Sequence, residues 1–194
     1  MATRNILSDG DKVLLKKSRI VTDFNKRLHI LLDDMRETLI AANGLGLAAP
    51  QVGVLRRVAL IVDTSIEYDK TDDISEDPTE EEIEEHRINQ YNKQTIELIN
   101  PEIIKSEGEQ TGREGCLSVP GVNAIVTRPN VVSLRAQDRD GNTFELEVSE
   151  LAARAVCHEV DHLDGVIFTT VADKILTDEE LEEYLAENEQ TKSE

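Results

Sequence analysis

Aromatic residues are scarce in this sequence. Phe, Tyr and Trp together make up 3% of the 194 residues, and tryptophan is absent. A chain of this length can bury one core of useful size. Because 39% of the residues are hydrophobic, we expect that core to be built from Leu, Ile, Val and Ala and to belong to a single domain.

Long hydrophobic runs are also missing. A transmembrane helix needs about 18 or more consecutive apolar residues, and the sequence contains no such stretch. Residues 1–11 lack the apolar segment of a secretory signal and are too acidic for a transit peptide. We therefore expect a cytoplasmic protein that does not interact with membranes.

Cysteine is rare, with Cys116 and Cys157 as the two examples. Two cysteines can form at most one disulfide. In a reducing compartment they are expected to serve as free thiols, metal ligands or small core residues.

Basic residues are heavily outnumbered, and the net charge is −19. This balance argues against DNA or RNA binding through a basic face. The acidity is concentrated in two segments: residues 63–94 carry 12 acids and 3 bases, and residues 173–194 carry 9 acids and 2 bases. The sequence therefore predicts a nearly neutral body with two acidic appendages.

The first regular element is predicted at residues 23–41. Asp23 can act as the N-cap, and Asn43 and Gly44 can end the helix. Apolar residues recur between them at the spacing of one helical face, namely Leu28, Leu31, Leu32, Met35, Leu39 and Ile40.

Strands are predicted on both sides of the first acidic segment. Residues 56–62 (RRVALIV) indicate a buried strand, and residues 95–100 (TIELIN) a second one that Pro101 stops. The stretch between them is expected to be a solvated loop with one acidic helical turn. Alternating apolar residues within 122–148, with the turn DRDG at 138–141, predict an antiparallel hairpin.

A second helix is predicted at residues 149–163, opened by Ser149 and stopped by Gly165. Its apolar residues are spread around the whole circumference. A helix that is apolar on nearly all sides lies in the interior of a fold. Its ionisable residues are therefore expected to be buried and to need partners.

This helix carries the motif HEVDH at 158–162. Four residues turn through about 400°, so His158 and His162 project from the same face and can bind one cation. Glu159 lies about 100° around the helix, within reach of a metal-bound water. Two histidines leave a catalytic metal one protein ligand short.

Several candidates for the third ligand can be weighed. A third histidine in the pattern HExxHxxGxxH is excluded because Phe168 stands at its position. Glu182 would suit a zinc endopeptidase, but it lies in the acidic tail. Cys116 is an upstream candidate, since a thiolate binds Fe(II) or Zn(II) strongly. A purely structural zinc site would need a fourth ligand, and neither His29 nor His86 has a suitable context.

Three ordered segments resemble the peptide deformylase family: GLGLAAPQ at 44–51, EGCLS at 114–118 and HEVDHLDG at 158–165. The resemblance covers most of residues 5–172, but not 64–94 or the tail. It implies an α+β fold, with short antiparallel β-sheets around a buried helix that carries HExxH. It also implies a catalytic domain at 1–172 with an acidic insertion at 64–94, followed by an acidic, helical tail at 173–194.

The resemblance further implies one divalent metal ion held by Cys116, His158 and His162, with Fe(II) as the native ion and Zn(II) or Ni(II) able to substitute. The implied reaction removes the N-formyl group from the leading methionine of newly made proteins. Glu159 would then be the general base and acid, while the Gln51 side-chain amide and the Leu117 backbone N–H would stabilise the oxyanion.

A substrate pocket and its supports are expected around these residues. Gly46 and Gly115 would let a peptide backbone approach closely. The methionine pocket would be lined by Leu45, Leu151 and Ala155. Two further expectations concern charged residues: an ion pair of Glu114 with Arg128 would hold the Cys116 loop, and Arg154 would extend its head to solvent.

The expected partners are N-formyl-methionyl nascent peptides and, transiently, the ribosome. Residues 178–189 read DEELEEYLAENE, with apolar residues at helical spacing. Acidic side chains repel ribosomal RNA. We therefore expect that the tail is not a basic anchor on the ribosome.

Overall fold

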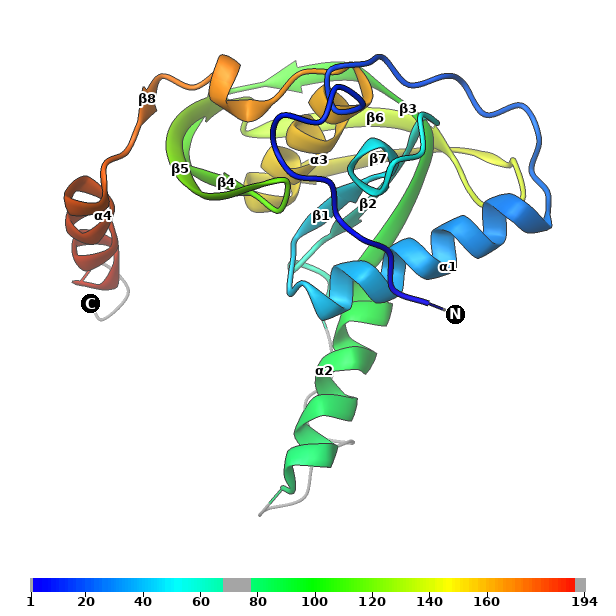
Figure 1. The fold of residues 1–194 in the computed structure, drawn as a ribbon, viewed down its shortest axis with the longest axis horizontal. Helices are drawn as coiled ribbons and strands as arrows, with labels where there is room; N and C mark the ends of the chain where they lie inside the picture. Colours follow the sequence, from blue (N-terminus) through cyan, green and yellow to red (C-terminus); the bar gives the residue numbers. More distant parts are fainter. Residues whose placement is uncertain (1, 68–77, 191–194) are drawn as a thin grey trace.

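Two antiparallel β-sheets pack against one central helix, α3 (Glu150–Leu163). The structure is a computed structural model that describes residues 2–67 and 78–190, and Figure 1 shows its arrangement. The first sheet has the order β1 (Gly46–Ala48), β2 (Val58–Val62), β3 (Thr95–Glu107), β6 (Val131–Gln137) and β7 (Thr143–Ser149). The second has the order β4 (Gln110–Cys116), β5 (Val119–Arg128) and β8 (Lys174–Ile175). The α+β class predicted from the sequence is confirmed.

Strand β2 is buried on both faces because a helix covers each of them. Val58, Leu60 and Val62 pack into the cluster formed with α1 (Lys26–Ala41). Ile61 points the other way, into the cluster formed with α3. Alternate residues of a strand face opposite sides. A run of five apolar residues can therefore pack against α1 on one face and against α3 on the other.

The start of α1 differs from the prediction by a few residues. Asn25, not Asp23, is the N-cap: its Oδ1 accepts hydrogen bonds from the backbone N–H groups of Arg27 at 2.9 Å and Leu28 at 3.3 Å. Asp and Asn are comparable N-caps. Periodicity alone could not choose between them.

The central helix α3 is buried as predicted. It begins after Ser149, which occupies the N-cap position without making a side-chain capping bond. Ala152, Ala153, Val156 and Cys157 pack against the inner face of the first sheet. The ionisable residues of the helix are therefore held inside the molecule.

Strand β3 is longer than predicted. It does not stop at Pro101 but continues to Glu107. The pairing of β3 with β6 shifts register between Ile99 and Glu102, so the proline lies at an irregularity where its missing N–H costs no ladder bond.

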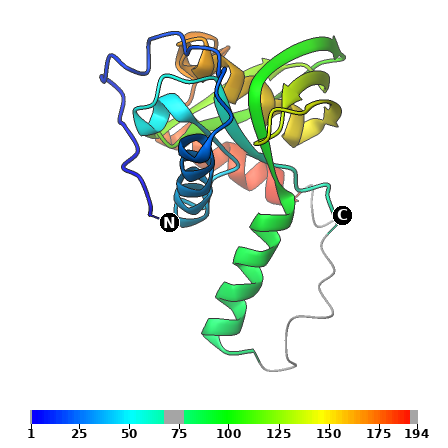
Figure 2. The same cartoon turned by 90° about the vertical axis from the view of Figure 1, so that its right-hand side faces the viewer.

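The acidic insertion also differs from the prediction. Residues 68–77 lie outside the described residues, but α2 (Glu80–Gln94) is a helix of 15 residues, not a single turn. Thr79 and Glu82 form a capping box at its start, and the acids in its first turn complement the helix dipole. Figure 2 shows α2 extending away from the sheets.

The remaining elements are short or terminal. The hairpin of β6 and β7 forms as predicted, with Gly141 in the left-handed region at its turn. The described residues also form the 3₁₀ turns η1 (Ala49–Val52) and η2 (Phe168–Thr170), and α4 (Asp178–Gln190) is the last described element. Within the described ranges no helix combines the length and apolar character needed to cross a bilayer.

Candidate metal and catalytic site

Cys116, His158 and His162 meet between the end of β4 and the C-terminal half of α3. One ligand atom from each lies within 4.8 Å of the others, and the Cys116 Sγ is 3.2 Å from the His162 Nε2. The two histidine rings are 4.9 Å apart at their centroids, as their one-turn spacing on a helix predicts. The structure therefore brings together all three residues that the sequence predicted as ligands.

An irregularity in β4 directs Cys116 toward the helix. The pairing of β4 with β5 shifts register between Gly115 and Cys116, and the chain then turns so that Cys116 pairs with Val119. Bulges of this kind often re-aim a side chain next to an active site. Cys157, by contrast, lies in the apolar cluster between α3 and the first sheet. Burial there raises the pKa of its thiol to about 11, so Cys157 is a core residue.

His158 is oriented by a carboxylate that sequence reasoning did not connect to it. Its Nδ1 lies 3.0 Å from Glu114 Oε2. Burial raises the pKa of Glu114, but hydrogen bonds from His158 and Arg128 lower it to about 2. An ionised carboxylate can only accept, so Nδ1 donates, and Nε2 is the ring nitrogen left to bind either a proton or a cation in the site. A carboxylate behind a ligating histidine is a recurrent support in metal sites.

The electrostatic field at the histidines favours positive charge near His158. Burial alone lowers the pKa of His158, but its contacts with Cys116 and Glu114 raise it to about 10. For His162, burial and then the neighbouring His158 lower the pKa to about 3. That ring is therefore neutral and can bind a cation through a nitrogen lone pair. The anionic groups that favour a proton here would equally favour a metal cation.

Glu114 is the centre of a buried ionic cluster. It accepts hydrogen bonds from Arg128 at 3.0 and 3.1 Å, which confirms the predicted ion pair, and another from Arg154 at 2.9 Å. Arg128 also pairs with Asp161 at 2.6 Å. Paired and hydrogen-bonded in this way, the charges can remain inside the fold.

The prediction that Arg154 reaches solvent is wrong. The residue is 6% exposed. In addition to Glu114, it donates to three backbone carbonyls of the second sheet, those of Gln110, Gly112 and Val126. These acceptors lie 28 to 44 residues away in the chain, and only the packing of α3 on β4 and β5 brings them within reach.

Glu159 is buried beside the histidines without a complete set of partners. It is 3% exposed, and its Oε2 has no hydrogen-bond partner in the described part of the chain. Burial raises the pKa of Glu159 to about 7, which suits a group that gains and loses a proton near neutrality. A Cβ on Gly46 would overlap the Glu159 carboxylate and lie 2.8 Å from its Cδ, so a side chain at this position would displace the carboxylate from where it lies.

Gln51 is buried, at 1% exposed, and its amide orientation is fixed. Its Oε1 accepts from the Ala48 backbone N–H at 2.7 Å. Its Nε2 therefore points the other way, 3.6 Å from the Cys116 Sγ and 3.2 Å from the Ser118 Oγ. A side-chain N–H donor is thus directed at the candidate metal site.

A pocket of about 530 Å³ opens onto this site. Its lining includes residues that the sequence predicted for substrate binding or the oxyanion: Leu45, Gly46, Gln51, Gly115, Leu117, Leu151 and Ala155. Leu45 and Leu151 are 39% and 44% exposed. Exposed leucines at a concave, mostly apolar surface are typical of a ligand pocket.

The residues present fit a divalent cation. Thiolate and imidazole donors suit Fe(II), Zn(II) and Ni(II). The Nδ1 of His162 and the Oε2 of Glu159 are buried without partners among the described residues. Unsatisfied buried polar atoms cost about 1–3 kcal/mol each, so a bound water or other small polar group is expected beside them.

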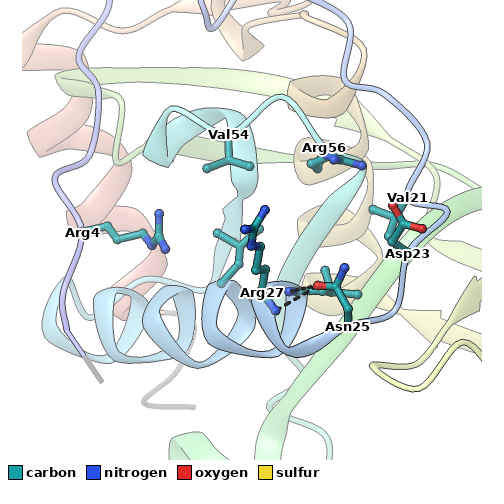
Figure 3. Close-up of a pocket in the computed structure, with 9 residues that line it drawn as sticks. Arg4, Val21, Asp23, Asn25, Arg27, Val54 and Arg56 are labelled. Atoms are coloured by element: carbon teal, nitrogen blue, oxygen red, sulfur yellow. Dashed lines mark hydrogen bonds between the residues drawn. The ribbon is translucent and has the colours of Figure 1, made fainter.

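A second hollow, of about 290 Å³, lies at the start of α1. Figure 3 shows Arg4, Arg27 and Arg56 around it, together with Asp23. Its lining includes no cysteine or histidine, and Arg4 is paired with Asp34. It lacks the donor set for metal chemistry and is not the candidate catalytic site.

Comparisons with known proteins show which family this chain resembles. A sequence model described as polypeptide deformylase matches residues 3–177. The peptide deformylase of Caldicellulosiruptor bescii is 46% identical over 183 residues, which are 94% of this chain and 93% of the relative.

Solved structures give the same result. A peptide deformylase from Legionella pneumophila matches with a TM-score of 0.72 at 32% identity, covering 99% of this chain and 98% of that chain. A class I type b peptide deformylase from Acinetobacter baumannii with Met-Ala-Ser bound matches with a TM-score of 0.70 at 26% identity, covering 88% of this chain and 98% of that chain. Similarity therefore extends over nearly the whole chain.

Proposed function

The chain belongs to the peptide deformylase family, and on that premise we propose which of its residues carry out the reaction. Peptide deformylases are metal-dependent hydrolases that remove the N-formyl group from the N-terminal methionine of newly synthesised proteins and release formate. The comparisons give no support to the alternative of a zinc endopeptidase.

Cys116, His158 and His162 hold one divalent ion in this proposal. The observation that carries it is the mutual approach of their donor atoms to within 4.8 Å. The bound ion supplies Lewis acidity, which lowers the pKa of water and polarises a carbonyl. Fe(II) is the proposed native ion, and Zn(II) or Ni(II) would substitute because the same donors suit all three.

Glu159 moves the proton. Its carboxylate accepts a proton from the attacking water as the water adds to the formyl carbon. It then returns that proton to the nitrogen of the departing amine, so that formate and a free amino terminus are produced. The proposal is supported by its burial beside His158 and by a pKa raised by burial to about 7.

Gln51 and Leu117 stabilise the negative charge that develops on the formyl oxygen. The hydrogen bond from the Ala48 N–H fixes the Gln51 amide with its Nε2 toward Cys116. The backbone N–H of Leu117 comes directly after Cys116 in the turn that ends β4 and is the second donor. Donors held in place before the reaction stabilise an oxyanion without a cost of reorganisation.

The pocket binds the methionine and the backbone that comes after it. Leu45, Leu151 and Ala155 contact the methionine side chain, while Gly46 and Gly115 allow the peptide to pair as an added strand. This assignment is supported by the pocket lining and by the Met-Ala-Ser peptide bound to the Acinetobacter relative.

Catalysis is assigned to residues 1–172, with the insertion at 64–94 and the tail at 173–194 as appendages. A cytoplasmic location is proposed from the substrate, because formylated chains are made there. Contact with the ribosome is proposed to be transient and independent of the acidic tail.

The decisive experiment is anaerobic hydrolysis of formyl-Met-Ala-Ser by the full chain, with metal analysis of the same preparation. Release of formate in proportion to the bound metal is expected, and casein should remain intact. With iron bound, activity should decay in air, because thiolates such as that of Cys116 are oxidised, whereas the zinc and nickel forms should persist. Cleavage of casein without release of formate would contradict the proposal.

A further inference from the structure

We propose that Tyr184 of α4 ends the part of β4 with which a bound peptide can pair. It thereby limits how many substrate residues after the methionine form backbone hydrogen bonds with β4. The inference rests on the proposed function, since it assumes that substrate adds as a strand beside β4. It assigns a role in specificity to the C-terminal helix.

The direction of the backbone groups in β5 can be deduced from its contacts with the segment around β8. The carbonyl of Ile125 accepts from the Asp173 N–H, and that of Asn123 accepts from the Leu176 N–H, both at 2.9 Å. Backbone groups of successive strand residues point to opposite sides. The intervening residues of β5, such as Ala124, therefore direct their backbone groups toward β4.

The free edge of β4 can then be identified. Gly112 pairs with Val126, and Glu114 pairs with Ala124, so these two residues of β4 use their backbone groups to bind β5. Arg113 and Gly115 must direct theirs away from β5. Since β4 is an edge strand of its sheet, these groups form an edge available for pairing.

Tyr184 occupies one of these two positions. Its Oη accepts a hydrogen bond from the Arg113 backbone N–H at 3.3 Å, and a Cβ on Gly112 would lie 3.8 Å from the same oxygen. Arg113 and Gly115 both line the 530 Å³ pocket. The helix therefore meets β4 at a residue that lines the pocket, two residues from the glycine beside Cys116.

The two-residue spacing between Gly115 and Arg113 determines where the contact of Tyr184 with Arg113 would stop a substrate from pairing. Free-edge groups recur at every second residue, roughly 6.6–6.8 Å along a strand. A peptide that pairs at Gly115 would reach Arg113 two residues later, where the N–H is already bound to Tyr184. The substrate therefore cannot accept a hydrogen bond from the Arg113 N–H, and Tyr184 stands beside the edge at the point where pairing would continue.

A series of formyl-methionyl peptides from one to six residues tests this inference. In the full metal-loaded chain, kcat/KM should rise with peptide length and then level off. Tyr184→Ala should move the plateau two residues further and raise kcat/KM for the longest peptides by about threefold to tenfold, the effect of one added hydrogen bond. Leu185→Ala, which alters an exposed neighbour on the same helix, should leave the plateau unchanged.

Binding of the unformylated product peptides, measured by calorimetry, provides a readout that needs no turnover. Affinity should level off at the same length as kcat/KM, and at a length two residues greater in Tyr184→Ala. An unchanged plateau in both series would overturn the inference while leaving deformylation intact. An equal increase in kcat/KM and affinity of Tyr184→Ala for peptides of every length would also overturn the inference. If no peptide is deformylated but the binding plateau still moves, the proposed function fails and the inference about β4 stands.

Discussion

Glu114 and His158 are joined by a hydrogen bond of 3.0 Å between Oε2 and Nδ1, which connects β4 to the helix that carries both histidines. The same carboxylate binds Arg128 and Arg154. One buried residue thus orients a candidate metal ligand and pairs with two buried cations, one of which, Arg128, also pairs with Asp161. Loss of its charge should affect both metal binding and folding.

Glu114→Gln should lower the affinity for zinc by about 10- to 100-fold, the usual effect of removing such a support. It should also destabilise the fold by roughly 3–5 kcal/mol, because two arginines lose a buried counter-charge. Chelator competition and urea unfolding would measure the two effects. Glu145→Gln is a matched control, since Glu145 pairs with Arg135 at an exposed site, where such pairs contribute about 0–1 kcal/mol. Equal effects of both variants would contradict the role given to Glu114.

Glu159→Ala should retain its metal and lose turnover by about 10²- to 10⁴-fold, because the role proposed for this residue is to transfer protons and not to bind the ion. His162→Ala should lose both properties. Metal content and formate release, measured on the same samples, distinguish the two roles. An empty site in Glu159→Ala would require Glu159 to be reassigned as a ligand.

Gly46→Ala should reduce turnover at unchanged metal content, because the added methyl group would overlap the Glu159 carboxylate. The double variant Gly46→Ala with Glu159→Ala tests this cause. Once the carboxylate is absent, the methyl group has space, so the double variant should be no slower than Glu159→Ala. A further loss of turnover would show that Gly46 acts in another way, such as through the backbone of the substrate.

Glu97 should make stability depend on pH. Burial raises its pKa, but hydrogen bonds and charge from Arg139, followed by Arg36, hold the pKa below the ordinary 4.5. A lowered carboxylate pKa stabilises the fold at pH values above 4.5, and this stabilisation disappears as the pH falls through the lowered value. Glu97→Gln should therefore cost about 1.5–3 kcal/mol at pH 7 and progressively less below pH 4.5, as measured by urea unfolding. A difference independent of pH would contradict this.

Deletion of residues 178–194 should leave affinity for ribosomes unchanged or raise it, most clearly at low salt, where screening is weakest. The segment is acidic and would repel ribosomal RNA. Replacing Glu179, Glu182 and Glu183 with Gln keeps the helix while removing charge, and should act in the same direction. Marked loss of binding by a folded, active truncation would show that the tail is an anchor.

The sequence by itself determined the features that depend on local geometry. A helix places residues four apart on one face whatever surrounds it, so the pairing of His158 with His162 and the separate position of Glu159 could be predicted. The hairpin of β6 and β7 could be predicted from alternation and a turn. The ordered motifs then indicated Cys116 and Gln51 by resemblance, although neither residue signals a role by its type alone.

Only the tertiary structure decided the contacts between distant segments. Arg154 was expected in solvent, but its acceptors lie on strands whose register is set by packing. The link from Glu114 to His158 spans 44 residues and depends on the bulge that comes after Gly115. The contact of Tyr184 with Arg113 spans 71 residues. Local spacing carries no information about such distances, because they are fixed when the sheets and helices pack together.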